Sequence, residues 1–358
     1  MIKVCLITCY NQPDYIRART LRAAFSAMDD VELIVVKNTH TNIRRYPEAM
    51  WRTIVARFKH HPDVYIQTFR AYESFPFFRL ITAGKPFIFD EFINPIEHVA
   101  YENGYIKPGS IVTKIARLGY KFWLLTVRLI ITDTPSHARY SAELMKLPIT
   151  DYVPLIVSTD EQVFTPKPKK IVKNAPFTVF YYGLFMMPLQ GLDTILEAMV
   201  RLQHKNIQLV LIGGKDSTKE LVKEAQDRGA NIVYKYRVPF EELADYMNNS
   251  DLCLGGPFGG TVQAQYVIGG KTYQYLQTER PVIIGKNEES HIWTDKKNAL
   301  IVDQKDPKQL ADAISWAEEH PKELAAIARS GKELYTKELS IKKLTQQLRL
   351  LLTNEHIL

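Results

Sequence analysis

Short apolar runs alternate with amphipathic stretches along the whole chain. Residues 177–182 form such a run, which ends at Gly183, and the stretch LDTILEAMVRL begins after Gly191 with apolar residues at helical spacing. This order predicts a strand, a tight turn and the start of a helix. Such a turn directs backbone N–H groups and a helix N-terminus at one point and suits a phosphate. The alternative is a plain turn without a ligand.

The same alternation continues to about residue 284. Predicted strands cover 207–212, 231–234, 252–254 and 281–284, and predicted helices cover 218–228, 240–249 and 271–277. Glycines cluster where strands end, as at Gly213 and in the loop after residue 254. Alternating strands and helices indicate a doubly wound parallel sheet, with ligands expected at the carboxyl ends of its strands.

The first half of the chain predicts a second sheet of the same kind. Its predicted strands are 2–7, 31–36, 64–66, 86–89, 129–132 and 151–153, with helices between them that include a long amphipathic one over 111–128. A stretch rich in Pro and Lys, residues 165–173, is typical of an interdomain linker. The sequence therefore predicts an α/β fold with two Rossmann-like, doubly wound domains, residues 1–170 and 171–337.

Positive charge is concentrated in the first half. Residues 1–172 hold 23 Lys and Arg against 16 Asp and Glu, a net charge of +7, whereas residues 173–358 hold 23 of each. This asymmetry indicates an anionic partner: phospholipid, a lipid-linked phosphate or nucleic acid. The alternative is a basic surface that serves solubility.

For the helix over 111–128 we expect an anionic membrane surface, with cations from Lys114, Arg117, Lys121 and Arg128 and apolar contact from Phe122 and residues 125–129. The alternative for this helix is that Phe122, Trp123 and Leu124 belong to the core. No nucleic-acid partner is expected.

Three cysteines without a disulfide pattern favour a reducing compartment. No signal peptide and no apolar run of about 18 residues are recognised, so the expected location is the cytoplasm, peripheral on the inner face of the plasma membrane.

Several pieces of the chain, taken in order, carry a family resemblance. They are FYYGLFMMPLQGLDTILEA, LVLIGG, VPFEELADYMNNSDLCLGG, KTYQYLQTERPVIIG and NALIVDQKDPKQLADAI. This set resembles the donor-binding half of retaining, two-domain glycosyltransferases of the GT-B fold, similar to family 4. The resemblance implies a cleft between two domains, a nucleotide-sugar donor on the second, an acceptor on the first, and a C-terminal helix, about 338–358, that packs back on the first.

The resemblance also implies a set of donor-binding positions. They are Gly183, Gln190, Gly191, Gly213, Val238, Pro239, Phe258, Gly259, Gly260, Thr261, Gln263, Lys271 and Tyr275. The family usually carries a Lys directly before the glycine that is Gly191 here, and two glutamates where this chain has Gln263 and Lys271. We interpret this as relocated charge, with Lys271 binding the diphosphate at a helix start; the alternative is a surface lysine.

Candidate acceptor or phosphate residues lie after the first strand. They are Tyr10, Asn11, Tyr15, Arg17 and Arg19, and an arginine in such a loop can bind phosphate through two hydrogen bonds. A solvated helix start is the alternative. Asp90 follows the fourth predicted strand and is expected to orient the acceptor or the transferred sugar, with His98 as the second catalytic candidate.

No D-x-D and no metal-ligand spacing occur in the chain, so neither a metal nor a cofactor is expected. The absence of G-x-G-x-x-G after the first strand argues against an NAD enzyme. The sequence therefore predicts a metal-independent, retaining hexosyltransferase that uses a nucleoside-diphosphate sugar and a saccharide or lipid-linked acceptor. The alternatives are a nucleotide-sugar 2-epimerase and a non-catalytic protein that binds sugar nucleotides or polyanions.

Overall fold

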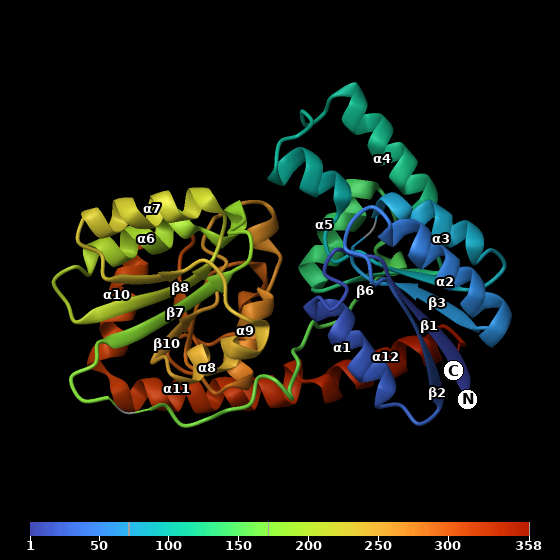
Figure 1. Ribbon diagram of the computed structural model, residues 1–358. Helices are drawn as coiled ribbons and strands as arrows, with labels where there is room; N and C mark the ends of the chain where they lie inside the picture. Colours follow the sequence, from blue (N-terminus) through green and yellow to red (C-terminus); the bar gives the residue numbers. More distant parts are fainter. Residues whose placement is uncertain (71, 171, 358) are drawn as a thin grey trace. The chain divides into compact units, whose positions relative to one another are not determined.

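The computed structural model describes residues 1–70, 72–170 and 172–357, and these form two compact units (Figure 1). The first unit contains residues 1–158 and the C-terminal segment that starts at Ser340, and the second contains Thr159–Leu339. The division between the units thus falls after Ser158, ahead of the predicted residue 170. Each unit has a six-stranded parallel sheet with helices on both faces, which confirms the predicted α/β fold class.

The sheet of the first unit has the strand order β2-β1-β3-β4-β5-β6. Its strands are β1 (Ile2–Thr8), β2 (Val31–Lys37), β3 (Val64–Gln67), β4 (Phe87–Asp90), β5 (Leu129–Thr132) and β6 (Tyr152–Pro154). The helices of this unit are α1 (Ile16–Ser26), α2 (Arg45–His60), α3 (Phe75–Ile81), α4 (Ile111–Leu124), α5 (Pro135–Met145) and α12 (Ile341–Asn354).

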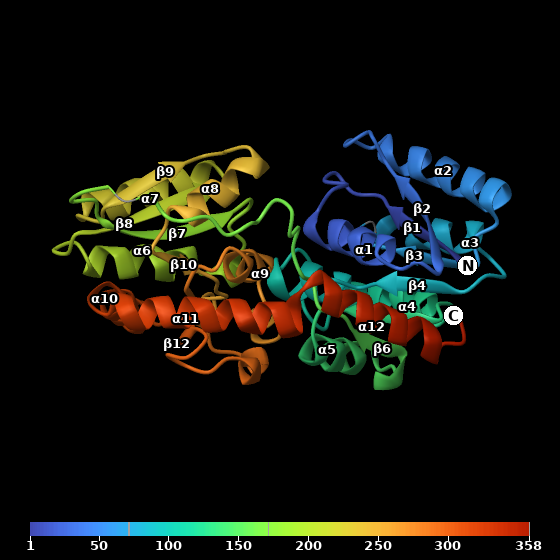
Figure 2. The same cartoon turned by 90° about the horizontal axis from the view of Figure 1, so that it is seen from below.

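Successive side chains of each strand point to opposite faces of the sheet, so the core of the first unit has two layers. Cys5 and Ile7 face one side, where α2, α3 and α5 cover the sheet, and Val4 and Leu6 face the other, where α1 and α12 cover it. Both views show α12 beside α1 (Figures 1 and 2), and the Thr345 hydroxyl donates to the carbonyl oxygen of residue 24 at 3.4 Å. The last helix of the chain is therefore part of the first unit.

The sheet of the second unit has the order β12-β11-β10-β7-β8-β9. Its strands are β7 (Phe177–Gly183), β8 (Ile207–Gly213), β9 (Ile232–Lys235), β10 (Leu252–Leu254), β11 (Val282–Gly285) and β12 (Leu300–Val302). Its helices are α6 (Leu192–Arg201), α7 (Asp216–Asp227), α8 (Leu243–Asn248), α9 (Gly270–Gln277), α10 (Pro307–Glu319) and α11 (Pro321–Leu334).

The order of the strands brings the glycine-rich loops of this unit together. Because β7 lies between β10 and β8, the loops that follow these three strands meet at one edge of the sheet. Helices α6, α7 and α10 cover one face of the sheet. On the other face the rings of Phe180 in β7 and Tyr246 in α8 stack at 6.3 Å.

Within the described residues, no helix is both long enough and apolar enough to cross a membrane.

Candidate functional site

The carboxyl ends of β7 and β8 meet through glycines. Gly214 donates its backbone N–H to the carbonyl oxygen of Gly183 at 2.9 Å. Gly213 has a φ of 100°, and a Cβ atom there would lie 2.3 Å from the same oxygen. A larger residue at Gly213 would push the two strand ends apart. Glycine is therefore needed at Gly213 because the backbones of the two strand ends pack directly against each other.

A second glycine contact joins the loop after β7 to the loop after β10. The backbone N–H of Gly259 donates to the carbonyl oxygen of Leu189 at 2.9 Å. A Cβ atom on Gly259 would lie 1.9 Å from the carbonyl oxygen of Pro188, and one on Gly191 would lie 2.5 Å from the carbonyl carbon of Phe258. Gly191, with a φ of 64°, is also the N-cap residue of α6. These contacts fix both loops at the start of that helix.

Lys271 lies at the start of α9, beside the end of β7. Its Nζ is 3.9 Å from the ring centroid of Tyr181 and 5.8 Å from that of Tyr182. No carboxylate in the described part of the chain forms an ion pair with it. Burial lowers the pKa of Lys271 to about 7, because the ammonium loses hydration and gains no counter-ion. A partly buried amine in this state is suited to bind an anion.

Two glutamines hold the tyrosine pair in place. The Tyr181 hydroxyl lies 3.3 Å from Oε1 of Gln190, and the Tyr182 hydroxyl donates to Oε1 of Gln274. A Cβ atom on Gly183 would lie 2.4 Å from Oε1 of Gln190, so this amide lies directly over the glycine. Gln190 is therefore part of the loop structure that surrounds the tyrosines, and Gln274 is a residue that the sequence analysis missed.

Phe258 and Tyr275, two of the predicted donor residues, have their rings in the interior of the second unit. Both side chains are completely buried. Phe258 lies in the core of the second unit, and the ring of Tyr275 packs edge-on against Phe180 at 6.0 Å. Burial is the environment that apolar ring surface favours. The backbone of Phe258 lies beside Gly191, and the contact of both residues with a donor stays a prediction.

The other predicted donor residues lie in loops at the same edge of the second sheet. Val238 and Pro239 follow β9, and Thr261 and the buried Gln263 follow β10. Gly260 has a φ of 60°, and a Cβ atom there would meet the side chain of Lys305 at 2.9 Å. Their contact with a donor stays a prediction.

In the first unit, Arg17 and Asp90 form a fully buried ion pair. Nε of Arg17 lies 3.0 Å from Oδ1 of Asp90, and its NH1 donates to the carbonyl oxygens of Leu155 and Ile156 at 2.9 and 2.8 Å. Burial raises the pKa of Asp90, and the Arg17 guanidinium opposes that rise. Each side chain thus has its partner inside the fold. The phosphate contact of Arg17 and the acceptor contact of Asp90 stay predictions.

Two further buried acids, Glu91 and Asp133, were not chosen as site residues from the sequence and lie at this edge of the first sheet. Glu91 accepts hydrogen bonds from the hydroxyls of Tyr120 and Ser141. Oδ1 of Asp133 lies 2.6 Å from Nδ1 of His137. Burial alone would lower the pKa of His137, but the bond to Asp133 outweighs it and raises the pKa. The spacing of four residues from Asp133 to His137, directly after a strand, was the available signal.

Tyr10 and Tyr15 belong to an aromatic cluster next to the buried ion pair. Their ring centroids are 5.9 Å apart, and Tyr15 also packs against Phe69 and Phe92 at 5.5 and 6.0 Å. Aromatic packing is the main role that the structure gives these two tyrosines. The other two candidates of this loop and helix are the exposed Asn11 and the half-buried Arg19, and their roles stay predictions.

His98 lies in the short helix Glu97–Glu102 and is half-buried. The side-chain nitrogen of Asn103 lies 3.1 Å from Nδ1 of His98. Burial and, to a lesser degree, the Arg70 cation lower the pKa of His98, so the imidazole is neutral near pH 7 and can accept a proton. Its catalytic role remains a prediction.

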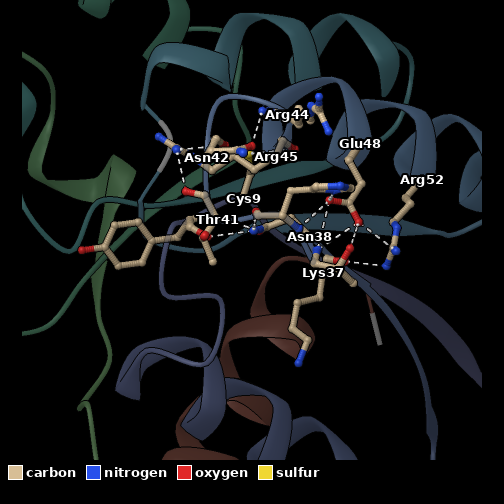
Figure 3. A network of polar contacts seen from close by, with 12 residues as sticks. Cys9, Lys37, Asn38, Thr41, Asn42, Arg44, Arg45, Glu48 and Arg52 are labelled. Atoms are coloured by element: carbon tan, nitrogen blue, oxygen red, sulfur yellow. Dashed lines mark hydrogen bonds and ion pairs between the residues drawn. The ribbon is translucent and has the colours of Figure 1, made fainter.

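A single carboxylate fixes the loop after β2 (Figure 3). Glu48 in α2 accepts hydrogen bonds from the backbone N–H groups of Thr39 and His40 at 2.9 and 3.0 Å and pairs with Arg52 at 2.8 Å. Partial burial would raise the pKa of Glu48, but the hydrogen bonds from His40 and Thr39 lower it to about 2. The loop, whose Arg44 side chain is exposed, is therefore pre-organised at the carboxyl edge of the first sheet.

Comparison with known proteins connects this geometry to a family. Residues 176–320 match the family model described as Glycosyl transferases group 1. This range contains the glycine-lined loops and Lys271. No curated protein sequence matches the chain.

Solved structures match over nearly the whole chain. Sucrose-phosphate synthase from Thermosynechococcus elongatus matches with a TM-score of 0.77 and 14% identity, over 99% of each chain. Anabaena HepE, in its complex with UDP and glucose, matches with a TM-score of 0.73 and 13% identity, over 99% of this chain and 100% of that one. A glycosyltransferase from Rickettsia africae matches with a TM-score of 0.67 and 12% identity, over 99% and 98% of the two chains.

At these identities the structural matches establish the fold. They share the GT-B fold with this chain, and the match to the family model lies in its second unit. This confirms the predicted GT-B fold, and the family match over residues 176–320 agrees with the resemblance to glycosyltransferases.

Proposed function

We propose that this chain, a protein of the GT-B glycosyltransferase fold, transfers a hexose or N-acetylhexosamine from a nucleoside-diphosphate sugar to a saccharide or lipid-linked acceptor. The observation that carries the proposal is Lys271, a partly buried amine beside the glycine-lined end of β7 that pairs with no carboxylate among the described residues. The family match covers this region, and HepE, of the same fold, is described in complex with UDP and glucose.

The charge of the leaving group explains why an amine is needed at this place. When the bond between the anomeric carbon and the phosphate oxygen breaks, its electron pair passes to the diphosphate, and negative charge grows there in the transition state. A nearby anion raises the pKa of an amine and restores its charge. The Lys271 ammonium then stabilises the transition state more than the bound substrate, which is the requirement for catalysis.

Helix starts add to this field. Helix α6 begins after Gly191, and α9 begins at Gly270, next to the end of β10. The positive ends of helix dipoles favour a bound anion. The same dipole makes the charged form of Lys271 unfavourable when the site is empty, so Lys271 and the diphosphate would stabilise each other.

Retention of configuration and independence from divalent metal ions are parts of the proposal. The resemblance to retaining enzymes supports the first. The second is supported by the choice of residue, because Lys271 can supply the charge that a metal held by a carboxylate pair would otherwise supply.

The first unit is proposed to bind the acceptor. Its candidates are Asn11, Arg19 and His98, with His98 as the group that can accept a proton. The buried Arg17–Asp90 pair is proposed to position this edge of the sheet and not to touch the substrate. We place the protein in the cytoplasm, on the inner face of the plasma membrane, with no nucleic-acid partner.

A non-catalytic protein that binds sugar nucleotides is the second candidate. The observation that favours it is the pair of residues Gln263 and Lys271, which stand where the resembled family carries glutamates. A binder would keep the affinity for the donor and lose turnover.

Incubation with UDP-, GDP- and ADP-sugars, with and without saccharide and lipid-linked acceptors, tests these alternatives. We expect one nucleotide sugar to release its nucleoside diphosphate slowly alone and faster with an acceptor, and to form a product that keeps the anomeric configuration by NMR. Binding without release would indicate a binder, and a sugar inverted at C2 would indicate an epimerase. Lys271→Met is the matched control, because its catalysed release should be lost.

A further inference from the structure

Helix α4 turns a stripe of large apolar side chains outward. Five residues, spaced four, three, four and three positions apart, are between 61% and 75% exposed: Ile111, Ile115, Leu118, Phe122 and Leu125. This spacing puts all five on one face of a helix. Figure 1 shows α4 at the outside of its unit. A stripe of this size is far more apolar surface than isolated exposed side chains provide.

The opposite face of α4 attaches the helix to its unit. Thr113 and Leu124 are buried, and the Tyr120 hydroxyl donates to the buried Glu91. At the end of the helix, Nε of Arg79 in α3 donates to the carbonyl oxygen of Thr126 at 2.8 Å. These contacts fix the rotation of α4 about its axis, so the outward direction of the stripe is a property of the folded unit.

Cations lie along one flank of the stripe. Lys114, Arg117 and Lys121 are three and four positions apart on the helix, next to the apolar face. Within the described residues none of the three forms an ion pair. The sequence contains no Asp or Glu between residues 103 and 132. The helix therefore combines an apolar face with uncompensated positive charge.

The neighbouring helices on the same side of the sheet add similar side chains. Trp51 and Phe58 in α2 are 66% and 70% exposed, and Leu80 in α3 is 62% exposed. Arg57 in α2 donates to the carbonyl oxygen of Ala83, just after α3, at 2.9 Å. Helices α2 and α3, like α4, therefore expose large apolar side chains to solvent.

We propose that α4 lies in the interface of an anionic lipid bilayer, with the apolar stripe inserted at the boundary of headgroups and acyl chains and the cations of its flank on the lipid headgroups. An amphipathic helix of this pattern binds membranes through apolar burial and electrostatic attraction together. This names the surface and the partner for the glycosyltransferase proposed above, and it agrees with a lipid-linked or membrane-located acceptor.

Charge complementarity selects the lipid surface over other occupants. A second copy joined through α4 would place one acid-free, cationic face against another, which is repulsive. An anionic bilayer supplies an apolar layer of acyl chains for the stripe and negative charge in its headgroup layer for the cations.

The structure also corrects which residues make the apolar contact. The sequence analysis assigned it to Phe122 and residues 125–129. Leu129 is buried in β5, whereas Ile111, Ile115 and Leu118 complete the stripe. The sequence pattern predicted a helix over this segment, but it did not reveal which face of α4 packs against the core.

Co-sedimentation with vesicles tests the proposal without donor or acceptor, so its outcome is independent of the glycosyltransferase assignment. The full chain is mixed at low salt with vesicles of phosphatidylcholine and phosphatidylglycerol in equal parts, and with phosphatidylcholine alone. We expect binding to the anionic vesicles that weakens at least tenfold with neutral vesicles or in high salt.

Two variants separate the two components of binding. Leu118→Ser with Phe122→Ser removes apolar contact, and Lys114→Gln with Arg117→Gln and Lys121→Gln removes charge; each should weaken binding at least tenfold. Leu221→Ser with Leu350→Ser, at exposed leucines of α7 and α12, is the control that should bind as the wild type does.

Three results would overturn the proposal. They are wild-type protein that stays in the supernatant with anionic vesicles at low salt, α4 variants that bind like the control, and a dimer, seen by light scattering, that Leu118→Ser with Phe122→Ser abolishes while vesicle binding is absent. The last would make the stripe an interface between copies.

Discussion

The carboxyl edges of the two sheets hold charged side chains in opposite states. At the edge of the first sheet, Arg17 and Asp90 neutralise each other, and Asp133 pairs with His137. At the edge of the second sheet, Lys271 has the faces of two tyrosines and no carboxylate partner in the described residues. At the first edge these charged side chains have counter-ions within the protein. At the second edge Lys271 has no counter-ion among the described residues.

This difference separates charges that support the fold from a charge that is suited to a ligand. A buried ion pair is costly to break, since removing one partner leaves the other unpaired in a medium of low dielectric constant. A buried amine without a partner destabilises the empty site and is stabilised when an anion arrives. The same residue types thus point to structure in the first unit and to binding in the second.

The largest expected effect comes from breaking the buried pair. Asp90→Asn should lower the free energy of unfolding by about 3–5 kcal/mol, because Arg17 would remain charged and buried. Denaturant unfolding of the full chain measures this. Arg17→Met combined with Asp90→Leu should recover much of the loss. A small effect of Asp90→Asn on stability, together with a large loss of turnover, would return Asp90 to a catalytic role.

Removal of the unpaired amine should act on the ligand and leave the fold intact. Lys271→Met should weaken the binding of the nucleoside diphosphate by about 1.5–3 kcal/mol, the range for a charge-assisted hydrogen bond. Isothermal titration calorimetry measures it, with Lys223→Met, at an exposed lysine within α7 of the same unit, as the control. Equal affinities in Lys271→Met and wild type would contradict the assignment.

Glycine contacts at the second edge should tolerate no side chain. Gly259→Ala should cost about 1–3 kcal/mol of stability, because its Cβ atom would meet the carbonyl oxygen of Pro188. Gly119→Ala in α4 meets nothing within 4 Å and should be neutral or slightly stabilising. Thermal unfolding compares the two variants. If they lost stability equally, close packing would not explain Gly259.

The smallest expected effect is that of metal removal. Turnover should be unchanged by EDTA, because Lys271 supplies the positive charge beside the leaving diphosphate. The assay is repeated with Mg²⁺ and Mn²⁺ added back. Activity that disappears with EDTA and returns with either ion would show that the charge at the site comes from a metal.

Much of the fold could be predicted from periodicity, and the glycine-rich edge of the second sheet from strand ends followed by glycines. Lys271 was found because it replaces an acid in a motif that the chain otherwise keeps. The Arg17–Asp90 pair could not be found, because its members are 73 residues apart and either one looks like a cleft residue at the end of a strand.

The sequence pattern also did not reveal which side chains of the site are buried. Phe258 lies in a loop of glycines and a proline, and Tyr275 lies in a helix rich in polar residues, yet both are completely buried. In α4 the period predicted an amphipathic helix, and only tertiary contacts such as that of Tyr120 with Glu91 decide which face is exposed.

Proton uptake on donor binding tests the central claim most directly. The free site holds Lys271 with a pKa of about 7, so at pH 8 most of the amine is neutral. If an intact nucleotide sugar raises that pKa, calorimetry at pH 8 in two buffers of different ionisation enthalpy should show close to one proton taken up per ligand, and affinity should fall as pH rises above 7. Lys271→Met should take up none. Binding without proton uptake by the wild type, or with equal uptake in both proteins, would contradict the account.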